Sequence, residues 1–169
     1  MSPTIRSWLA TSVFALAGII AVLFYSIVSP FLLPHFIIYM VLVINTFFSI
    51  RFWAAHQPND IRQFLIDAVL VVAYLTLAFS IGEPLHFAIV SLGVFIAATI
   101  KYVLMRGRTP HEALVEHKTF LDALGAIACA ALLGGTLSGY ALETAWIFAI
   151  GFSLANVHLL FVRPMYQLQ

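Results

Sequence analysis

The chain has 169 residues, of which 63% are hydrophobic and only 9% are charged. A soluble domain carries about 25% charged residues, because a globule of this size needs a polar exterior around its core. The composition therefore excludes a water-soluble globular protein, and a net charge of +1 gives no indication of a nucleic-acid partner. We expect an all-α integral membrane protein that forms a single membrane domain over residues 1–169.

Six apolar stretches are long enough to cross a bilayer as helices, which takes about 20 residues each. Turns that contain proline or glycine separate the helices of each predicted pair, and longer polar connections separate one pair from the next. The third and fifth stretches are close to the lower length limit. In chain order, the predicted transmembrane helices cover residues 8–28, 31–52, 64–81, 85–105, 120–137 and 140–162.

The basic residues all fall on one side of the membrane in this arrangement, whereas the loops on the other side carry only Glu83 and Glu143. By the positive-inside rule, the basic side faces the cytoplasm. We therefore predict a multi-pass protein of the bacterial inner membrane with both termini inside. The eight basic residues are Arg6, Arg51, Arg62, Lys101, Arg106, Arg108, Lys118 and Arg163.

The three helix pairs resemble one another in sequence. An offset of about 56 residues aligns a basic residue just before each odd-numbered helix and, two positions later, an aromatic residue at its start: Arg6, Arg62 and Lys118, then Trp8, Phe64 and Phe120. Evenly spaced hairpins under the positive-inside rule would align the basic residues without a repeat, but not the aromatic ones. We predict three tandem helical hairpins at approximately residues 4–57, 60–110 and 116–167.

This layout resembles that of the bacterial acid-resistance membrane proteins built from three tandem hairpins. The resemblance implies the arrangement of helices alone. The glycine-rich helices of that family are missing from this chain, which has nine glycines in total.

Among the polar residues inside the predicted helices, six form a candidate cluster in one layer about 6–10 Å below the inner surface by the rise of an α-helix. Intramembrane polar residues are functional candidates, and here they could line a cytoplasm-facing pocket for an ion, a proton or a polar headgroup. The alternative is structural: ion pairs of Lys101 with Asp67 or Asp122, and hydrogen bonds between helices through Asn45 and Asn156. We favour the structural interpretation, because the outer two-thirds of the spans offers almost no polar path. The six residues are Asn45, Asp67, Lys101, Asp122, Asn156 and His158.

The loop before the fifth helix is the most substantial polar segment. Thr109-Pro110-His111-Glu112 predicts a capping box with proline at the first helical position, so that residues 112–118 extend the helix into the cytoplasm. Basic residues near this loop predict a surface for anionic lipid or a protein partner. They are Arg62, Arg106, Arg108 and Lys118.

His35 and His86 lie at the outer ends of the second and fourth helices, where they could face each other as haem ligands. Haem ligation in a bundle usually uses histidines within the spans. We therefore favour ordinary interfacial histidines and predict no cofactor.

No catalytic motif is present, and no acidic cluster is suited to bind Mg²⁺. The sequence therefore predicts a small non-enzymatic protein, an accessory or stabilising subunit of a larger membrane complex or of a homo-oligomer. Its partners would be the lipid bilayer and other membrane subunits or further copies of itself. One alternative is a small ion, proton or solute transporter or channel that uses the polar layer; a weaker one is a haem- or quinone-linked redox module.

Overall fold

A computed structural model of the chain describes residues 2–25, 29–57 and 60–166, which contain helices and turns but no strand. All the helices are long and apolar enough to cross a membrane, the last one when counted with the π-helical turn η1 (His158–Val162) that continues it. The prediction of a multi-pass, all-helical membrane protein is confirmed. The helices are α1 (Pro3–Phe24), α2 (Leu32–Trp53), α3 (Ile61–Phe79), α4 (Pro84–Met105), α5 (Glu112–Leu137) and α6 (Ala141–Val157).

Local sequence signals explain most helix ends. The hydroxyl of Ser2 accepts a hydrogen bond from the N–H of Ile5 and caps α1, whose first residue is Pro3. Pro84 is likewise the first residue of α4, although its N-cap residue Glu83 makes no side-chain capping hydrogen bond. The predicted helices agree with the observed ones to within about three residues except at the starts of α1 and α5, which lie earlier than predicted, and the predicted end of the first at residue 28 lies outside the described residues.

The start of α5 differs from the predicted capping box. Pro110 precedes the helix, His111 is its N-cap, and Glu112 is its first residue. The carboxylate of Glu112 accepts a hydrogen bond from the N–H of Gly107 at 3.1 Å, and so stabilises the preceding turn rather than the helix. Gly107 has a φ of +68°, which glycine adopts readily, and this turns the chain back before the helix begins. The predicted extension through residues 112–118 is helical.

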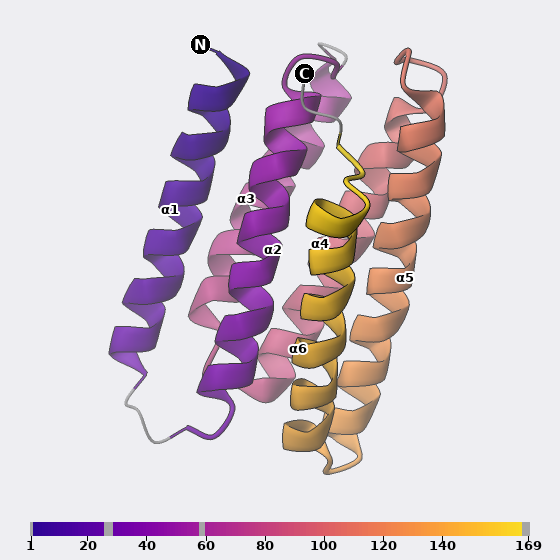
Figure 1. The fold of residues 1–169 in the computed structure, drawn as a ribbon. Helices are drawn as coiled ribbons and strands as arrows, with labels where there is room; N and C mark the ends of the chain where they lie inside the picture. Colours follow the sequence, from indigo (N-terminus) through magenta and orange to yellow (C-terminus); the bar gives the residue numbers. More distant parts are fainter. Residues whose placement is uncertain (1, 26–28, 58–59, 167–169) are drawn as a thin grey trace.

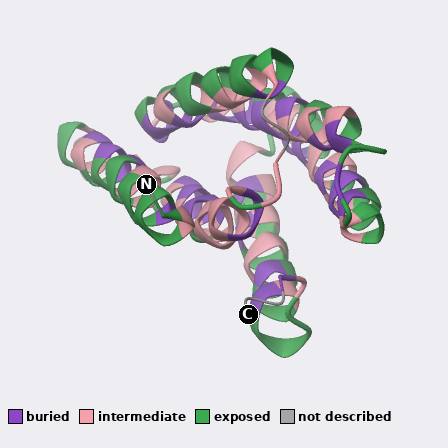
Figure 2. Ribbon diagram, turned by 90° about the horizontal axis from the view of Figure 1, so that it is seen from above, coloured by how far each residue is buried: buried purple, intermediate pink, exposed green. Residues whose placement is uncertain are grey.

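The six helices are arranged in a ring. Each helix packs against two others, in the order α1, α2, α6, α5, α4, α3 and back to α1. Figure 1 shows that the helices run alternately up and down, with both termini at the same end of the molecule. Figure 2 shows the helices from above, with buried residues on most of them. The last helix therefore closes the ring against the first hairpin.

Two apolar clusters fill the ring at different heights. The larger one occupies the half remote from the termini and includes the fully buried Tyr39, Leu77 and Phe87. The smaller one lies at the end that holds the termini, where Tyr166 packs beside Phe52 after the chain leaves η1. The space between the two clusters is where polar side chains gather.

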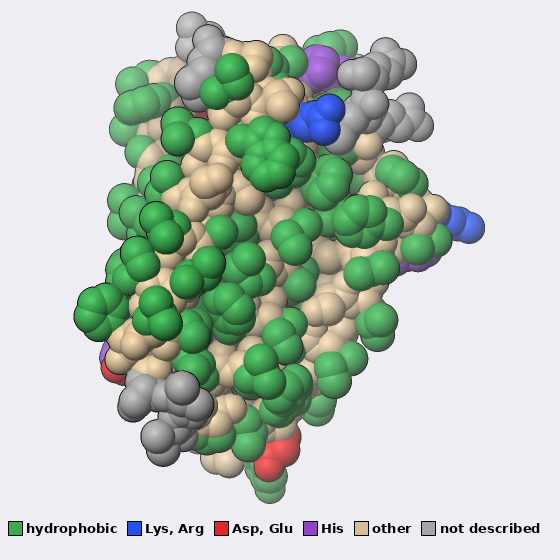
Figure 3. Space-filling view, turned by 60° about the vertical axis from the view of Figure 1, so that its left-hand side comes forward, with side chains coloured by type: hydrophobic (Ala, Val, Ile, Leu, Met, Phe, Trp, Pro, Cys, Tyr) green, Lys and Arg blue, Asp and Glu red, His purple; other side chains and the backbone are tan. Residues whose placement is uncertain are grey.

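The face of the lateral surface in Figure 3 carries many hydrophobic side chains and few charged ones. Large hydrophobic side chains such as Leu16, Val72 and Ile147 are exposed all around the ring, which is far more apolar surface than a soluble monomer presents. All eight basic residues and five of the carboxylates lie in the half that holds the termini, whereas Glu83 and Glu143 lie at the other end. If a bilayer surrounds the middle of the ring, the protein presents a basic end on one side of the membrane and an acidic end on the other.

Candidate functional site

A cavity of about 750 Å³ lies inside the ring, in the half that holds the termini. Five helices, α1 to α5, contribute to its wall. Its floor is apolar and consists of Phe14, Leu42 and Phe95, below which the larger core cluster begins. We call this cavity the central pocket. Its polar lining consists of Arg6, Asn45, Thr46, Ser49, Gln57, Asp67, Tyr74, Lys101, Tyr102, Lys118 and Asp122.

One wall of the central pocket contains an ion pair between α3 and α4. The ammonium of Lys101 lies 2.7 Å from Oδ1 of Asp67. The side-chain amide of Gln57 donates a hydrogen bond to Oδ2 of the same carboxylate at 2.7 Å. Asp67 is 38% exposed and Lys101 only 12%, so the carboxylate is the more accessible member. This is one of the two pairings that the sequence suggested.

A second ion pair lies deeper, on α5. The ammonium of Lys118 lies 2.6 Å from Oδ1 of Asp122 and 5.7 Å from the centre of the Tyr102 ring, within range of a cation–π interaction. Both side chains are buried. Oδ2 of Asp122 is buried too and has no hydrogen-bond partner in the described part of the chain. This oxygen therefore has an unused capacity to accept a hydrogen bond.

The position of Lys118 corrects the prediction that it belongs to an exposed basic surface. Because α5 begins at Glu112, Lys118 is already in the second turn of the helix. Its spacing of four residues from Asp122 places both side chains on the same face, and that face points into the ring.

A pair of asparagines closes the ring between α2 and α6. The amide of Asn45 donates a hydrogen bond to Oδ1 of Asn156 at 2.5 Å, and the amide of Asn156 donates to the carbonyl of Phe152 at 2.9 Å. This interhelical bond is the role that the sequence suggested for the two residues. His158 does not join them: it is exposed, because two further residues turn its side chain about 200° around the helix axis.

Two pairs of hydroxyl groups that connect helices across the ring were not predicted from the sequence. The hydroxyl of Thr46 lies 2.7 Å from that of Tyr74 on α3, and the hydroxyl of Ser49 lies 2.7 Å from that of Tyr102 on α4. Tyr74 and Tyr102 are tyrosines inside apolar spans, and a buried tyrosine hydroxyl usually has a partner. That was the available signal, although nothing in the sequence identified the partners.

The two histidines considered as haem ligands are not brought together. His35 is buried, its Nδ1 lies 2.8 Å from the carbonyl oxygen of Ile81, and its ring stacks on Phe87. His86 is exposed and pairs with Glu83, one turn earlier on the chain. His35 is therefore a core residue rather than an interfacial one. Residues 2–25, 29–57 and 60–166 contain no group of three or more side chains placed to hold a metal ion.

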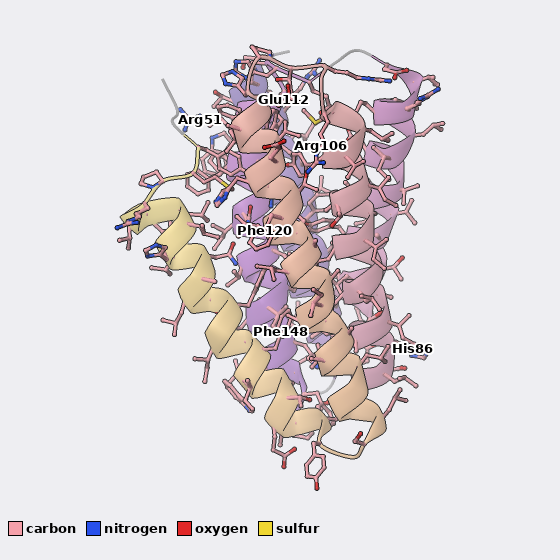
Figure 4. All side chains as sticks on the ribbon, turned by 90° about the vertical axis from the view of Figure 1, so that its right-hand side faces the viewer. Arg51, His86, Arg106, Glu112, Phe120 and Phe148 are labelled. Atoms are coloured by element: carbon pink, nitrogen blue, oxygen red, sulfur yellow. The ribbon has the colours of Figure 1, made fainter. Side chains whose placement is uncertain are left out.

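The arginines of the predicted basic surface remain at the rim of the ring. Arg62 and Arg106 are exposed, and Figure 4 shows Arg106 near Glu112 at the end that holds the termini. Arg108 forms an ion pair with Asp60 at 2.7 Å. The backbone N–H of Arg62 and the guanidinium of Arg108 hold the pKa of Asp60 below its ordinary value.

Comparisons with protein-family models, curated proteins and solved structures find no match to this chain. The central pocket is thus the feature from which a function can be inferred.

Proposed function

We propose that the protein is a non-enzymatic membrane protein whose central pocket binds a small anionic group. The observation that carries this proposal is the convergence of polar side chains from five helices on one cavity with an apolar floor. Isolated structural ion pairs need no such cavity. Because the pocket ends at the apolar side chains of Phe14, Leu42 and Phe95, it is better suited to bind an anion than to conduct one across the membrane.

Charge favours an anion over a cation. Arg6, Lys101 and Lys118 line the pocket together with two carboxylates, Asp67 and Asp122. Both carboxylates are already paired with lysines, whereas Arg6 takes part in none of the ion pairs among the described residues. The half of the protein around the pocket holds eight basic residues against five carboxylates, and such an excess concentrates anions at the pocket mouth.

The orientation and the repeat are further parts of this proposal. The confinement of basic residues to one end supports a pocket that opens to the cytoplasm, with both termini inside an inner membrane. The period of about 56 residues supports three hairpins derived from one unit. A transporter that loads its solute from the cytoplasm would use the same pocket.

A second candidate function is that of an accessory subunit of a larger membrane complex or homo-oligomer. It is supported by the continuous apolar lateral surface (Figure 3), which can pack against neighbouring helices as well as lipid. Purification in mild detergent tests it, because a partner or a second copy should remain bound. The redox alternative has no such support, since His35 and His86 have separate partners; a Soret band would revive it.

Thiol labelling tests the pocket directly. In a Cys129→Ala background, Ala98→Cys places a thiol in the pocket wall, and Val69→Cys places one on the lateral surface. We expect a membrane-impermeant thiol reagent to label Ala98→Cys from the cytoplasmic side alone, and glycerol phosphate to slow that labelling. Val69→Cys should stay unlabelled. The proposal fails if a folded Ala98→Cys is inert, or if glycerol phosphate leaves its labelling rate unchanged.

A further inference from the structure

A second cavity, of about 430 Å³, runs between α5 and α6. Its lining is almost wholly apolar, with Leu124 and Ala128 on α5 and Ile147 and Phe148 on α6. It extends along α6 and into η1, from Thr144 to Leu159, a distance of about 22 Å at the rise of an α-helix. This exceeds the thickness of one leaflet of the hydrocarbon core, which is about 15 Å. We call this cavity the lateral groove.

The lateral groove opens sideways, toward the bilayer. Figure 4 shows α5 and α6 diverging from their connecting turn toward the end that holds the termini, with Phe148 on α6. Leu124 and Ile147 line the groove and are also exposed on the lateral surface. A Cβ added to Gly151 would meet no atom within 4 Å, so the groove is open beside this residue.

The lateral groove and the central pocket are contiguous. Four residues line both cavities: Asn45, Phe95, Lys118 and Asp122. The polar end of the groove is thus the buried ion pair on α5, next to the Asn45–Asn156 bond. Oδ2 of Asp122, which lacks a hydrogen-bond partner, lies in the carboxylate that both cavities share. The combined site is apolar toward the lipid and polar toward the interior of the ring.

We propose that this combined site binds one phospholipid of the surrounding leaflet. An acyl chain occupies the lateral groove, and the headgroup occupies the central pocket. This inference rests on the proposed function, because the headgroup phosphate is the anionic group that the pocket receives. An aqueous anion alone would leave the groove unexplained, whereas a lipid already present in the bilayer fits both cavities.

The polar groups also specify the class of headgroup. Arg6, Lys101 and Lys118 are suited to a phosphate, and the free oxygen of Asp122 requires an N–H or O–H donor. Phosphoethanolamine and phosphoglycerol carry both a phosphate and such donors. Phosphocholine carries the phosphate but no donor, so it leaves Asp122 unsatisfied and should bind more weakly.

A matched pair of glycine variants tests the groove. Gly151→Leu places a side chain in the lateral groove. Gly93→Leu is the control: Gly93 lies on α4, it lines neither cavity, and a Cβ added there also meets no atom within 4 Å. Both changes replace an exposed glycine within a helix by a better helix former. Both variants should therefore fold, and the unfolding temperature of each should be no lower than that of the original protein.

The measurement is the lipid retained by the purified protein after incubation with mixed micelles of phosphatidylethanolamine, phosphatidylglycerol or phosphatidylcholine, read by native mass spectrometry. We expect the original protein and Gly93→Leu to retain the first two lipids at least about tenfold more tightly than phosphatidylcholine, a difference of about 1.4 kcal/mol. Gly151→Leu should lose at least tenfold in affinity for them. It should still show slower Ala98→Cys labelling in glycerol phosphate, since the pocket itself is unchanged.

The failures of the two proposals are distinguishable. If Gly151→Leu retains lipid like Gly93→Leu while glycerol phosphate still protects Ala98→Cys, the lateral groove is not the acyl-chain site and the proposed function survives. Equal retention of phosphatidylcholine overturns the headgroup assignment. If neither lipid nor glycerol phosphate binds the original protein, both proposals fall.

Discussion

The ammonium of Lys118 lies 2.6 Å from the carboxylate of Asp122, one helical turn further along α5, and each side chain is less than a tenth exposed. Removal of either partner leaves the other charge buried without compensation. In soluble proteins such a loss costs about 3–5 kcal/mol, whereas removal of both partners costs far less.

We therefore expect Lys118→Met and Asp122→Asn each to lower the free energy of unfolding by on the order of 3 kcal/mol. The double variant should be more stable than either single one, since the two effects are coupled. Thermal unfolding in detergent measures both. Additive losses would show that the two charges do not depend on each other. Lys101→Met serves as a comparison: its partner Asp67 is 38% exposed, so we expect a loss of no more than about 1 kcal/mol.

The Asn45–Asn156 hydrogen bond should stabilise the closure of the ring by a modest amount. Hydrogen bonds between transmembrane helices contribute about 0.6–2 kcal/mol. We expect Asn45→Ala and Asn156→Ala each to lose an amount in this range, and a double-mutant cycle to return a positive coupling energy. If the cycle returns a coupling near zero, the two amides do not interact in the membrane. His158→Ala, which alters an exposed residue close to Asn156, is the matched control and should have no effect.

Asp60 should make stability depend on pH at the acidic end. The backbone N–H of Arg62 and the guanidinium of Arg108 hold its pKa below the ordinary value. A carboxyl group with a lowered pKa in the folded state stabilises the protein above its unfolded pKa, and this contribution is lost as the pH falls through the folded value.

We thus expect the unfolding temperatures of the original protein and Asp60→Asn to differ at pH 7 and to converge below about pH 4. Asp60→Ala should be the less stable variant at every pH, because it also loses the side-chain oxygen that accepts from Arg62 at the start of α3. A difference between the original protein and Asp60→Asn that does not change with pH would contradict the ion pair with Arg108.

Close packing of α1 on α2 should make Gly18 intolerant of a side chain. A Cβ at this position would lie 2.5 Å from Cε1 of Tyr39. Tyr39 is fully buried and donates a hydrogen bond to the carbonyl of Phe14 at 2.8 Å, so its ring cannot move aside. We expect Gly18→Val to lower the free energy of unfolding by about 1–3 kcal/mol. Gly93→Val, which meets open space, should be neutral in the same assay, and equal effects of the two variants would contradict the close packing of Gly18 on Tyr39.

The transmembrane helices were predictable from the sequence because the bilayer imposes a simple length and hydropathy requirement. The Lys101–Asp67 pair and the Asn45–Asn156 bond were also within reach, since few polar residues occur in the spans and each needs a partner. The third and fifth transmembrane stretches were predicted to start too late because charged residues near the helix starts, Arg62 in the first turn of α3 and Lys118 in the second turn of α5, interrupt the apolar stretch without interrupting the helix.

The ring order and the cavities were not predictable. Hydropathy places each helix across the membrane but does not specify its neighbours or its rotation about its own axis. That rotation decides that Lys118 faces inward and His158 outward. It also decides that His35, although near a helix end, is buried against Phe87. The lateral groove depends on the divergence of α5 from α6 (Figure 4), which no local sequence signal encodes.

The closure of the ring by α2 and α6 joins residues 111 positions apart in the chain. Since a membrane protein is synthesised from its N-terminus, α2 exists long before its partner helix. Through most of synthesis the amide of Asn45 lacks its partner Asn156, and the wall formed by α6 is missing. The lateral groove is completed only with the last helix, so a chain that ends before α6 leaves the amide of Asn45 without the partner that it has in the closed ring.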